Sequence, residues 1–242
     1  MNAPNAPTTP AGPAAAVAPA AAPRSGPARL AARQLAARRG DRLLFRGLDL
    51  EVHAGEIVWL RGTNGRGKTS LLRLLAGLST PAEGEVQVRG EALTKAAAQW
   101  RHDLAYIAHA NALKDDLLAH EALRFVAGLR GVPVAPEAVR RALERLGVAR
   151  QAGLPVRVLS QGQRRRVALA RLALPDAPGL WLLDEPFDAL DEAGIATLAA
   201  LLHEHATAGG AALLTSHQAL PAGLATRVLD LDTVPRAARP AG

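Results

Sequence analysis

The sequence predicts an α/β fold with a parallel sheet, and two stretches carry this prediction. Residues 62–69 (GTNGRGKT) form a glycine-rich loop between a short apolar run at residues 56–61 and a helical leucine pattern at residues 68–75. Residues 180–186 (LWLLDEP) are four apolar residues followed by two acids. Strands that are apolar along their whole length are typical of sheets buried on both faces. The order of strand, glycine-rich loop and helix predicts that the first stretch is a phosphate-binding loop.

The composition indicates a globular protein with an aliphatic core. Of the 242 residues, 49% are hydrophobic but only 3% are aromatic, so the core is expected to consist of Ala, Leu and Val. The absence of cysteine excludes disulfides and thiolate sites. The net charge of +7 comes from arginines scattered through an Ala-rich sequence, which we interpret as compositional bias and not as a specific nucleic-acid surface. No apolar run reaches the ~18 residues that a membrane span requires, so we expect a soluble or peripheral protein.

The chain begins with an Ala/Pro-rich segment, residues 1–27, which predicts a disordered tail. A signal peptide is the competing interpretation, but the segment lacks a basic start and prolines interrupt its apolar part. The folded domain is therefore expected at residues 28–242. Its first elements are predicted as short strands at residues 30–37, 43–45 and 48–53.

The residue types of the phosphate-binding loop suit an anionic ligand. Glycine allows backbone conformations that turn successive N–H groups toward an anion, and the following helix adds its positive N-terminus. Lys68 supplies a cation for the β- and γ-phosphates, and the Thr69 hydroxyl can ligate Mg²⁺. We therefore expect a nucleoside triphosphate here. The candidate binding residues are Gly62, Thr63, Asn64, Gly65, Arg66, Gly67, Lys68, Thr69 and Ser70.

A mostly helical part is predicted between the loop and the acidic stretch, at about residues 100–175. Gly131 and Pro133 end its first helix, Pro136 suits a first helical turn, and Pro175 ends the last helix. The predicted elements are strands at residues 84–90 and 103–107 and helices at about 120–130, 136–146 and 164–174.

The acidic stretch predicts catalytic carboxylates. Residues 180–183 form a buried strand, and the carboxyl ends of such strands are where open α/β sheets bind ligands. Asp184 can hold Mg²⁺, and Glu185 can act as the base for an attacking water. The chain is then predicted to continue with a helix at residues 192–205 and strands at 211–215 and 228–231.

Residues 159–163 (LSQGQ) resemble a motif of a known protein family. They resemble the L-S-G-G-Q signature motif of ATP-binding cassette (ABC) proteins, with Gln161 in place of one glycine. Ser160 stands at a predicted helix start, where its hydroxyl and the Gly162 N–H can address a γ-phosphate. The alternative is an ordinary helix N-cap. The position between the phosphate loop and the acidic strand favours the signature, in which Gln163 is the final residue.

The resemblance extends to two further positions. Asp191, in Ala-Leu-Asp after the acidic strand, resembles the D-loop residue, and His217, after the strand at 211–215, resembles the switch histidine that contacts the γ-phosphate. Glu185, His217 and Lys68 are thus the candidate catalytic residues. The resemblance implies a phosphate-loop fold with an antiparallel β subdomain and a helical subdomain, which hydrolyses ATP with Mg²⁺. It also implies a head-to-tail dimer, in which each ATP lies between one chain's phosphate loop and the other chain's signature.

Four stretches are similar to the haem-exporter ATP-binding proteins of cytochrome c maturation, namely residues 62–73, 108–114, 183–191 and 215–218. This similarity implies two copies of the chain with two copies of an integral membrane subunit, on the cytoplasmic face of a bacterial inner membrane. It implies haem-handling partner proteins and either haem export or release of a haem-loaded chaperone, and no specific nucleic acid. Alternatives are the ATP-binding subunit of another small-molecule or lipid exporter and, more distantly, a soluble cassette acting on nucleic acid or ribosomes.

The chain departs from the family pattern in two places. Ala110 stands where most cassettes have a glutamine that senses Mg²⁺, and His109 or Asn111 could replace it. Arg38 or Arg39 falls near the position of the aromatic residue that stacks on adenine. Stacking on the base would then be cationic or absent.

Overall fold

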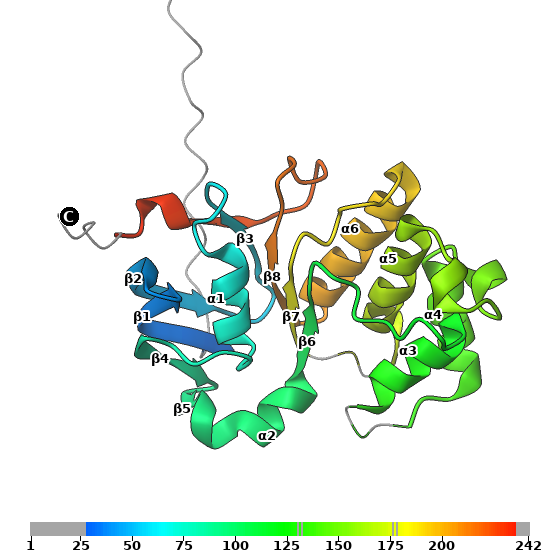
Figure 1. Cartoon of the computed structure of the whole chain (residues 1–242), viewed down its shortest axis with the longest axis horizontal. Helices are drawn as coiled ribbons and strands as arrows, with labels where there is room; N and C mark the ends of the chain where they lie inside the picture. Colours follow the sequence, from blue (N-terminus) through cyan, green and yellow to red (C-terminus); the bar gives the residue numbers. More distant parts are fainter. Residues whose placement is uncertain (1–27, 130, 132, 176, 178, 236–242) are drawn as a thin grey trace, which may run out of the picture.

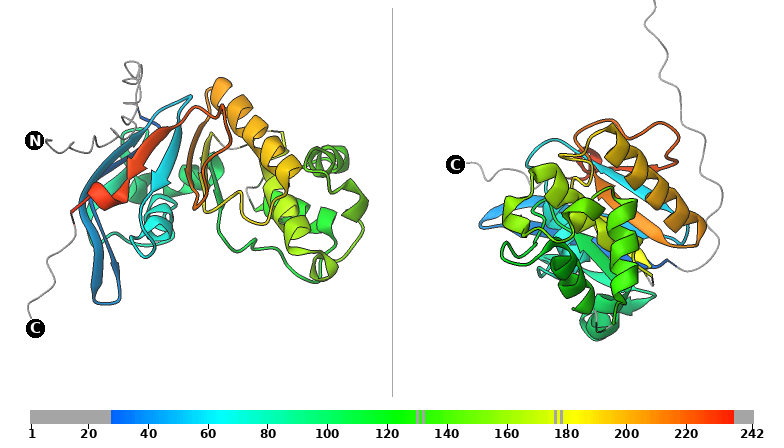
Figure 2. Two further views of the ribbon diagram at one scale, coloured as in Figure 1. Left: turned by 90° about the horizontal axis from the view of Figure 1, so that it is seen from above. Right: turned by 90° about the vertical axis from the view of Figure 1, so that its right-hand side faces the viewer.

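The computed structural model describes residues 28–129, 131, 133–175, 177 and 179–235, and the predicted tail at residues 1–27 lies outside them. In the described part, an antiparallel sheet and a group of helices lie at opposite ends of the molecule, with a parallel sheet between them (Figures 1 and 2). None of the helices in this part is long and apolar enough to cross a membrane.

The antiparallel sheet has the strand order β2-β1-β4-β5. It consists of β1 (Leu30–Arg39), β2 (Arg42–Val52), β4 (Glu83–Val88) and the short β5 (Glu91–Ala92). The prediction of two separate strands at 43–45 and 48–53 was wrong, because β2 is continuous. The pairing of β1 with β2 continues past the polar middle of β2 through register shifts between the two strands and a left-handed Gly47, φ +69°.

The parallel sheet confirms the predicted α/β class. Its order is β6-β7-β8-β3-β9, and every neighbouring pair is parallel. The strands are β3 (Ile57–Arg61), β6 (Leu104–Ile107), β7 (Leu180–Leu183), β8 (Ala211–Thr215) and β9 (Arg227–Asp230). Because crossovers between parallel strands bring all carboxyl ends to one edge, the loops after β3, β6, β7 and β8 meet there.

Both faces of the parallel sheet are buried, each in a different core. In β7, Leu180 and Leu182 pack with α1 (Lys68–Leu75) and the antiparallel sheet. Trp181 and Leu183 point the other way and pack with α6 (Glu192–Thr207) and the helical subdomain. The two-residue period of a strand thus explains why all four apolar residues of the acidic stretch are needed.

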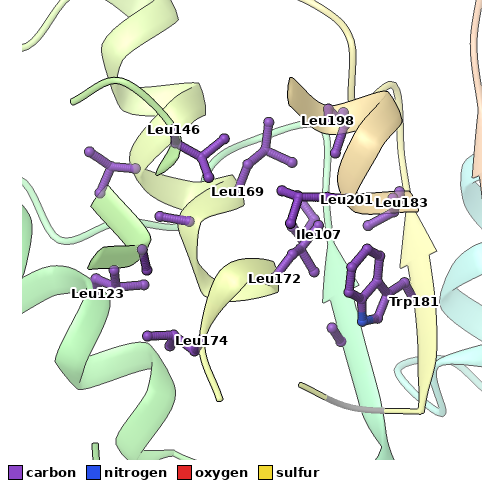
Figure 3. Close-up of a cluster of buried hydrophobic side chains, with 14 of the residues drawn as sticks. Ile107, Leu123, Leu146, Leu169, Leu172, Leu174, Trp181, Leu183, Leu198 and Leu201 are labelled. Atoms are coloured by element: carbon purple, nitrogen blue, oxygen red, sulfur yellow. The ribbon is translucent and has the colours of Figure 1, made fainter. Parts of the chain in front are cut away.

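The helical subdomain packs its apolar stripes on that second face. It contains α3 (Ala119–Gly128), α4 (Pro136–Arg145) and α5 (Gln161–Leu169). One cluster joins Trp181 and α6 to the helical subdomain, and Figure 3 shows it with Leu123 of α3, Leu169 of α5 and Leu146 just after α4. The third predicted helix ends earlier than expected, since its last turn, Ala170–Ala173, is a 3₁₀ helix before Pro175.

The helix α2 (Leu93–Asp103) was not predicted from the sequence. Its Ala-rich middle has a weak apolar stripe, so the helical period is hard to see. Trp100 anchors it, because the buried indole Nε1 donates to the Leu75 carbonyl at the end of α1, 3.1 Å away. The helix therefore depends on tertiary contact more than on local pattern.

Candidate functional site

The phosphate loop connects β3 to α1 in the predicted order. Gly62, Gly65 and Gly67 have φ values of +145°, +77° and +103°, which glycine adopts without strain. Gly67 is also the N-cap of α1, and a Cβ there would lie 3.2 Å from the Leu44 side chain. The buried Lys68 curls back over the loop and donates from Nζ to the Gly62 carbonyl at 2.7 Å. The loop is thus a preformed concave cradle beside a helix N-terminus.

A C-terminal residue, Asp232, holds the outer turn of this loop. Its carboxylate accepts from the Thr63 N–H at 2.7 Å, from the Thr63 hydroxyl at 3.0 Å and from Arg66 Nε at 3.0 Å. These bonds, the Thr63 N–H first, lower the pKa of Asp232. The carboxylate therefore stays charged to a lower pH than an ordinary aspartate does, and the contact is lost as the pH falls through this lowered pKa.

The side chain of Arg66 serves the same anchoring and does not reach for a ligand. It is 2% exposed, and its guanidinium also donates to the carbonyls of Leu44, Leu231 and Val234. Sequence reasoning placed Arg66 among the binding residues; its backbone belongs to the loop, while its side chain ties the loop to β2 and to the C-terminal segment.

Replacing Asp232 with Asn is expected to weaken ATP binding about 3- to 10-fold with little change in kcat. Asn keeps one acceptor but loses the charge that holds Thr63 and Arg66, and the solvent around this exposed carboxylate limits the size of the effect. Titration with a fluorescent ATP analogue measures the effect. Asp49→Asn is the matched control, since Asp49 bonds only to Gln34 among the contacts described, away from the loop. Equal affinities for the two variants would contradict the anchoring role.

Asp184 comes directly after β7 and is 2% exposed. Its Oδ1 accepts from the Thr215 hydroxyl at 2.9 Å. Its Oδ2 is also buried but has no hydrogen-bond partner among the described residues. A buried carboxylate oxygen without a protein partner is costly unless a cation or water completes it. The unpartnered Oδ2 of Asp184 is therefore suited to bind a metal ion.

Glu185 is held in a defined direction by the residues after β8. Its Oε2 accepts from the backbone N–H of His217 at 2.9 Å, and its Oε1 lies 3.3 Å from His217 Nε2. Glu185 is 6% exposed, whereas the His217 side chain is 52% exposed. The carboxylate is thus fixed at the base of the site, with the imidazole at its rim.

Thr215, the last residue of β8, links the Asp184 carboxylate to the backbone of Glu185 and was missed as a functional residue. Its hydroxyl donates to Asp184 Oδ1 and accepts from the Glu185 N–H at 2.8 Å. The side chain is completely buried. The sequence offered one signal, a polar residue at the carboxyl end of an otherwise apolar strand.

One cavity of about 310 Å³ brings these groups together. It is lined by the phosphate loop, both carboxylates and His217. Of the alternatives left open by the sequence, Arg39 lines this cavity together with Leu44, and His109 lines it from the loop after β6. Asn111 instead contacts Arg165 through its Oδ1, 3.2 Å away. Arg39 is the side chain near the cavity on which a base could stack.

The signature residues form a helix start away from this cavity. Ser160 caps α5, accepting from the Gln163 N–H at 3.3 Å, while the Gln163 side chain accepts from the Ser160 N–H at 2.9 Å. A Cβ at Gly162 would lie 2.8 Å from the Ala189 carbonyl, so the segment packs tightly on the D-loop. Both interpretations of Ser160 therefore describe the same geometry: a capped helix N-terminus whose first residues, Ser160 and Gln161, are exposed.

Asp191 caps α6 by accepting from the Gly194 N–H at 2.8 Å, and it pairs with Arg166. The hydrogen bond from the Gly194 N–H lowers the pKa of Asp191, and Arg166 lowers it further. Asp191, Ser160, Gly162 and Gln163 all belong to the described part of the chain, and all lie outside the lining of the cavity. One copy of the chain thus does not bring its signature to its own phosphate loop.

Comparison with known proteins shows the family of this chain. Residues 45–188 match the family model described as "ABC transporter". The chain is 49% identical over 205 residues to the "Cytochrome c biogenesis ATP-binding export protein CcmA" of Aromatoleum aromaticum, covering 85% of this chain and 96% of the relative. It is 50% identical over 192 residues to the protein of the same name from Nitrosococcus oceani, covering 79% and 87%.

Solved structures share the fold. An ATP-binding subunit of an ABC transporter superposes with a TM-score of 0.70 at 27% identity, over 78% of this chain and 79% of the other. A dimeric ATP-binding cassette in a post-hydrolysis state, bound to ADP and Pi, has a TM-score of 0.68 at 22% identity, over 78% and 88%.

Proposed function

This chain belongs to the ABC transporter family of ATP-binding, ATP-hydrolysing subunits, and we propose that it drives the export step of cytochrome c biogenesis. The observation that supports the pathway is the 44–50% identity to cytochrome c biogenesis relatives along most of both chains. The cavity that joins the phosphate loop to Glu185 and His217 supports the chemistry. In this proposal, either haem itself or a haem-loaded chaperone is released by the work of hydrolysis.

The phosphate loop binds the triphosphate of ATP. Its inward N–H groups and the α1 N-terminus neutralise phosphate charge, and Lys68 exchanges its bond to the Gly62 carbonyl for the β- and γ-phosphate oxygens. Arg39 stacks on the adenine in place of an aromatic residue. Such stacking is tolerant of the base, so we expect modest discrimination between ATP and GTP.

Mg²⁺ suits the donor set, with Thr69 and Asp184 as its holders. The Thr69 side chain is exposed at the start of α1, and Asp184 supplies the unpartnered Oδ2. Hard oxygen donors are what Mg²⁺ prefers, and when bound it neutralises charge on the β- and γ-phosphates. Thr215 holds the other carboxylate oxygen and keeps Asp184 aimed at the cavity.

Glu185 acts as the general base. A water in line with the γ-phosphate gives its proton to a carboxylate oxygen of Glu185 while the water oxygen bonds to phosphorus and the bond to ADP breaks. The His217 N–H keeps the carboxylate in position, and the His217 imidazole donates to a γ-phosphate oxygen. Because Asp184 and Glu185 are buried, the reacting groups exchange little water with the bulk solvent.

A second copy of the chain completes each site. The signature segment is exposed and lies outside the cavity of its own chain, which supports a head-to-tail dimer where Ser160, Gly162, Gln163 and Asp191 face the partner's nucleotide. Two integral membrane subunits bind this dimer, which is peripheral to the cytoplasmic face of the inner membrane. Haem-handling maturation proteins receive the output.

Complementation tests the pathway. The chain is expressed in a bacterium that lacks its own cytochrome c biogenesis ATP-binding protein, together with any integral membrane subunit that the neighbouring genes encode. We expect haem-stained c-type cytochromes to return with the natural sequence and to stay absent with Lys68→Ala at equal protein level. If the natural sequence does not restore the cytochromes and the neighbouring gene encodes a drug-efflux permease, the chain belongs to another exporter.

A further inference from the structure

Arg165 is a buried charged residue that the proposed mechanism does not use. It lies in the second turn of α5, the helix that the signature segment begins, and it is 3% exposed. It belongs to the described residues but not to the lining of the nucleotide cavity. A buried guanidinium is unfavourable unless its N–H groups are paired, so its contacts indicate what it does there.

Each nitrogen of Arg165 donates to the loops that follow β6 and β7. Nη2 donates to the carbonyls of Asp184, at 3.0 Å, and Glu185, at 2.6 Å. Nε donates to the Pro186 carbonyl at 3.3 Å. Nη1 donates to the Ala108 carbonyl at 3.0 Å and to Asn111 Oδ1 at 3.2 Å. The side chain therefore spans three successive carbonyls around the catalytic carboxylates and the loop that carries His109.

The surrounding carboxylates favour a cation at this position, and the arrangement of the acceptors favours a guanidinium. Burial lowers the pKa of Arg165, and the carboxylates of Asp188, Asp184 and Glu185 oppose that effect. Arginine remains charged under such conditions, and its planar fork reaches several acceptors at once, which a lysine ammonium cannot do over the same distance.

Glu185 needs such support because its backbone is unusual. Its φ is +48°, in the left-handed region that non-glycine residues rarely adopt. Thr215 holds its N–H from one side and Arg165 holds its carbonyl from the other. The peptide groups on both sides of the Glu185 side chain are thus fixed, and with them the direction in which the carboxylate leaves the backbone.

We propose that Arg165 is a positioning residue that sets the direction of the Glu185 carboxylate through the Asp184 and Glu185 carbonyls and couples it to the signature helix. The coupling rests on the proposed function, in which the signature of one copy faces the nucleotide of its partner. Arg165 then joins the part of the chain that contacts the partner's nucleotide to the base that acts on its own. The two sites of the dimer are linked through this side chain in each copy.

A double-mutant cycle tests whether Arg165 acts through Glu185. R165Q is expected to lower kcat about 10- to 100-fold with KM for ATP within about 2-fold, because a misplacement of the base near 1 Å costs up to ~10²-fold. R165Q added to E185Q is expected to change the residual single-turnover rate less than about 2-fold, since the base is already absent. Equal losses in both backgrounds would overturn the proposal, as would an unchanged kcat in R165Q.

Two controls separate positioning from folding. R145Q removes an arginine of the same subdomain that only bridges α4 to Glu204 on the surface, and its kcat is expected to stay unchanged. R165K keeps the charge but not the fork, so it is expected to recover part of the lost kcat. If R165Q fails to fold in thermal unfolding, the same cycle with R165K decides.

Two different results would refute the role of Arg165 and the proposed function. Absence of ATP hydrolysis by the natural chain would remove the proposed function. Hydrolysis by the natural chain that E185Q abolishes and R165Q leaves intact would remove only the role of Arg165.

Discussion

Glu185→Gln is expected to slow steady-state ATP hydrolysis by about 100- to 1000-fold while the Kd for ATP stays within about 2-fold. Glutamine has the same shape and still accepts the His217 N–H that holds the carboxylate at 2.9 Å, but it cannot take the proton of the attacking water. The loop that grips the triphosphate is untouched, so binding persists. Phosphate release and equilibrium binding are measured on the same preparation.

Glu144→Gln is the matched control for this variant. Glu144 pairs with Arg140 on the exposed face of α4, and its loss should leave turnover unchanged. Turnover by Glu185→Gln equal to that of Glu144→Gln would exclude Glu185 as the base and point to a different proton acceptor.

Lys68→Ala is expected to raise the Kd for ATP by about 100-fold and thereby to abolish hydrolysis at ordinary ATP concentrations. The substitution removes a cation from a buried position beside the loop, where charge-assisted hydrogen bonds are worth roughly 1.5–3 kcal/mol each. It also leaves the Gly62 carbonyl without the Lys68 donor. Binding titration with Mg·ATP measures the loss.

Lys95→Ala serves as the control, because Lys95 is an exposed residue of α2 outside the cavity lining. Retained affinity in Lys68→Ala, at the level of Lys95→Ala, would mean that the triphosphate lies elsewhere.

Local pattern explains which parts of the site were predictable. The phosphate loop and the Asp184–Glu185 pair each lie within a few residues of a strand end. Residue type and periodicity therefore sufficed to predict the α/β class and the strand that precedes each of these two stretches. The roles of the individual site residues stay predictions, although the cavity gathers Lys68, Glu185 and His217 as expected.

The residues that sequence reasoning missed act across large separations. Asp232 reaches Thr63 from the other end of the described chain. Thr215 bonds to the Asp184 carboxylate and to the Glu185 N–H in the loop after another strand, and Arg165 reaches three carbonyls of that loop from a helix. The local patterns around Asp232 and Arg165 do not differ from those of an ordinary surface acid and a helical arginine, and the one signal for Thr215 is a polar residue at the end of an apolar strand. Only the topology brings them to the carboxyl edge of the sheet.

The same reasoning applies to two structural errors. The helix α2 is held by Trp100 on the Leu75 carbonyl, a contact between segments that a single window of sequence does not contain. The continuous β2 depends on register shifts in its pairing with β1, which let the ladder continue past the polar residues that looked like a break in the sequence.

The central claim is that each nucleotide site is half formed in one chain and completed by another. Sedimentation velocity of Glu185→Gln, with and without ATP, tests it most directly. We predict a monomer without ATP, a species of twice the mass with ATP, and no such species when Ser160→Arg or Lys68→Ala is added to Glu185→Gln. A Glu185→Gln protein that binds ATP but stays a monomer, together with natural-sequence hydrolysis at a specific rate independent of protein concentration, would contradict the claim.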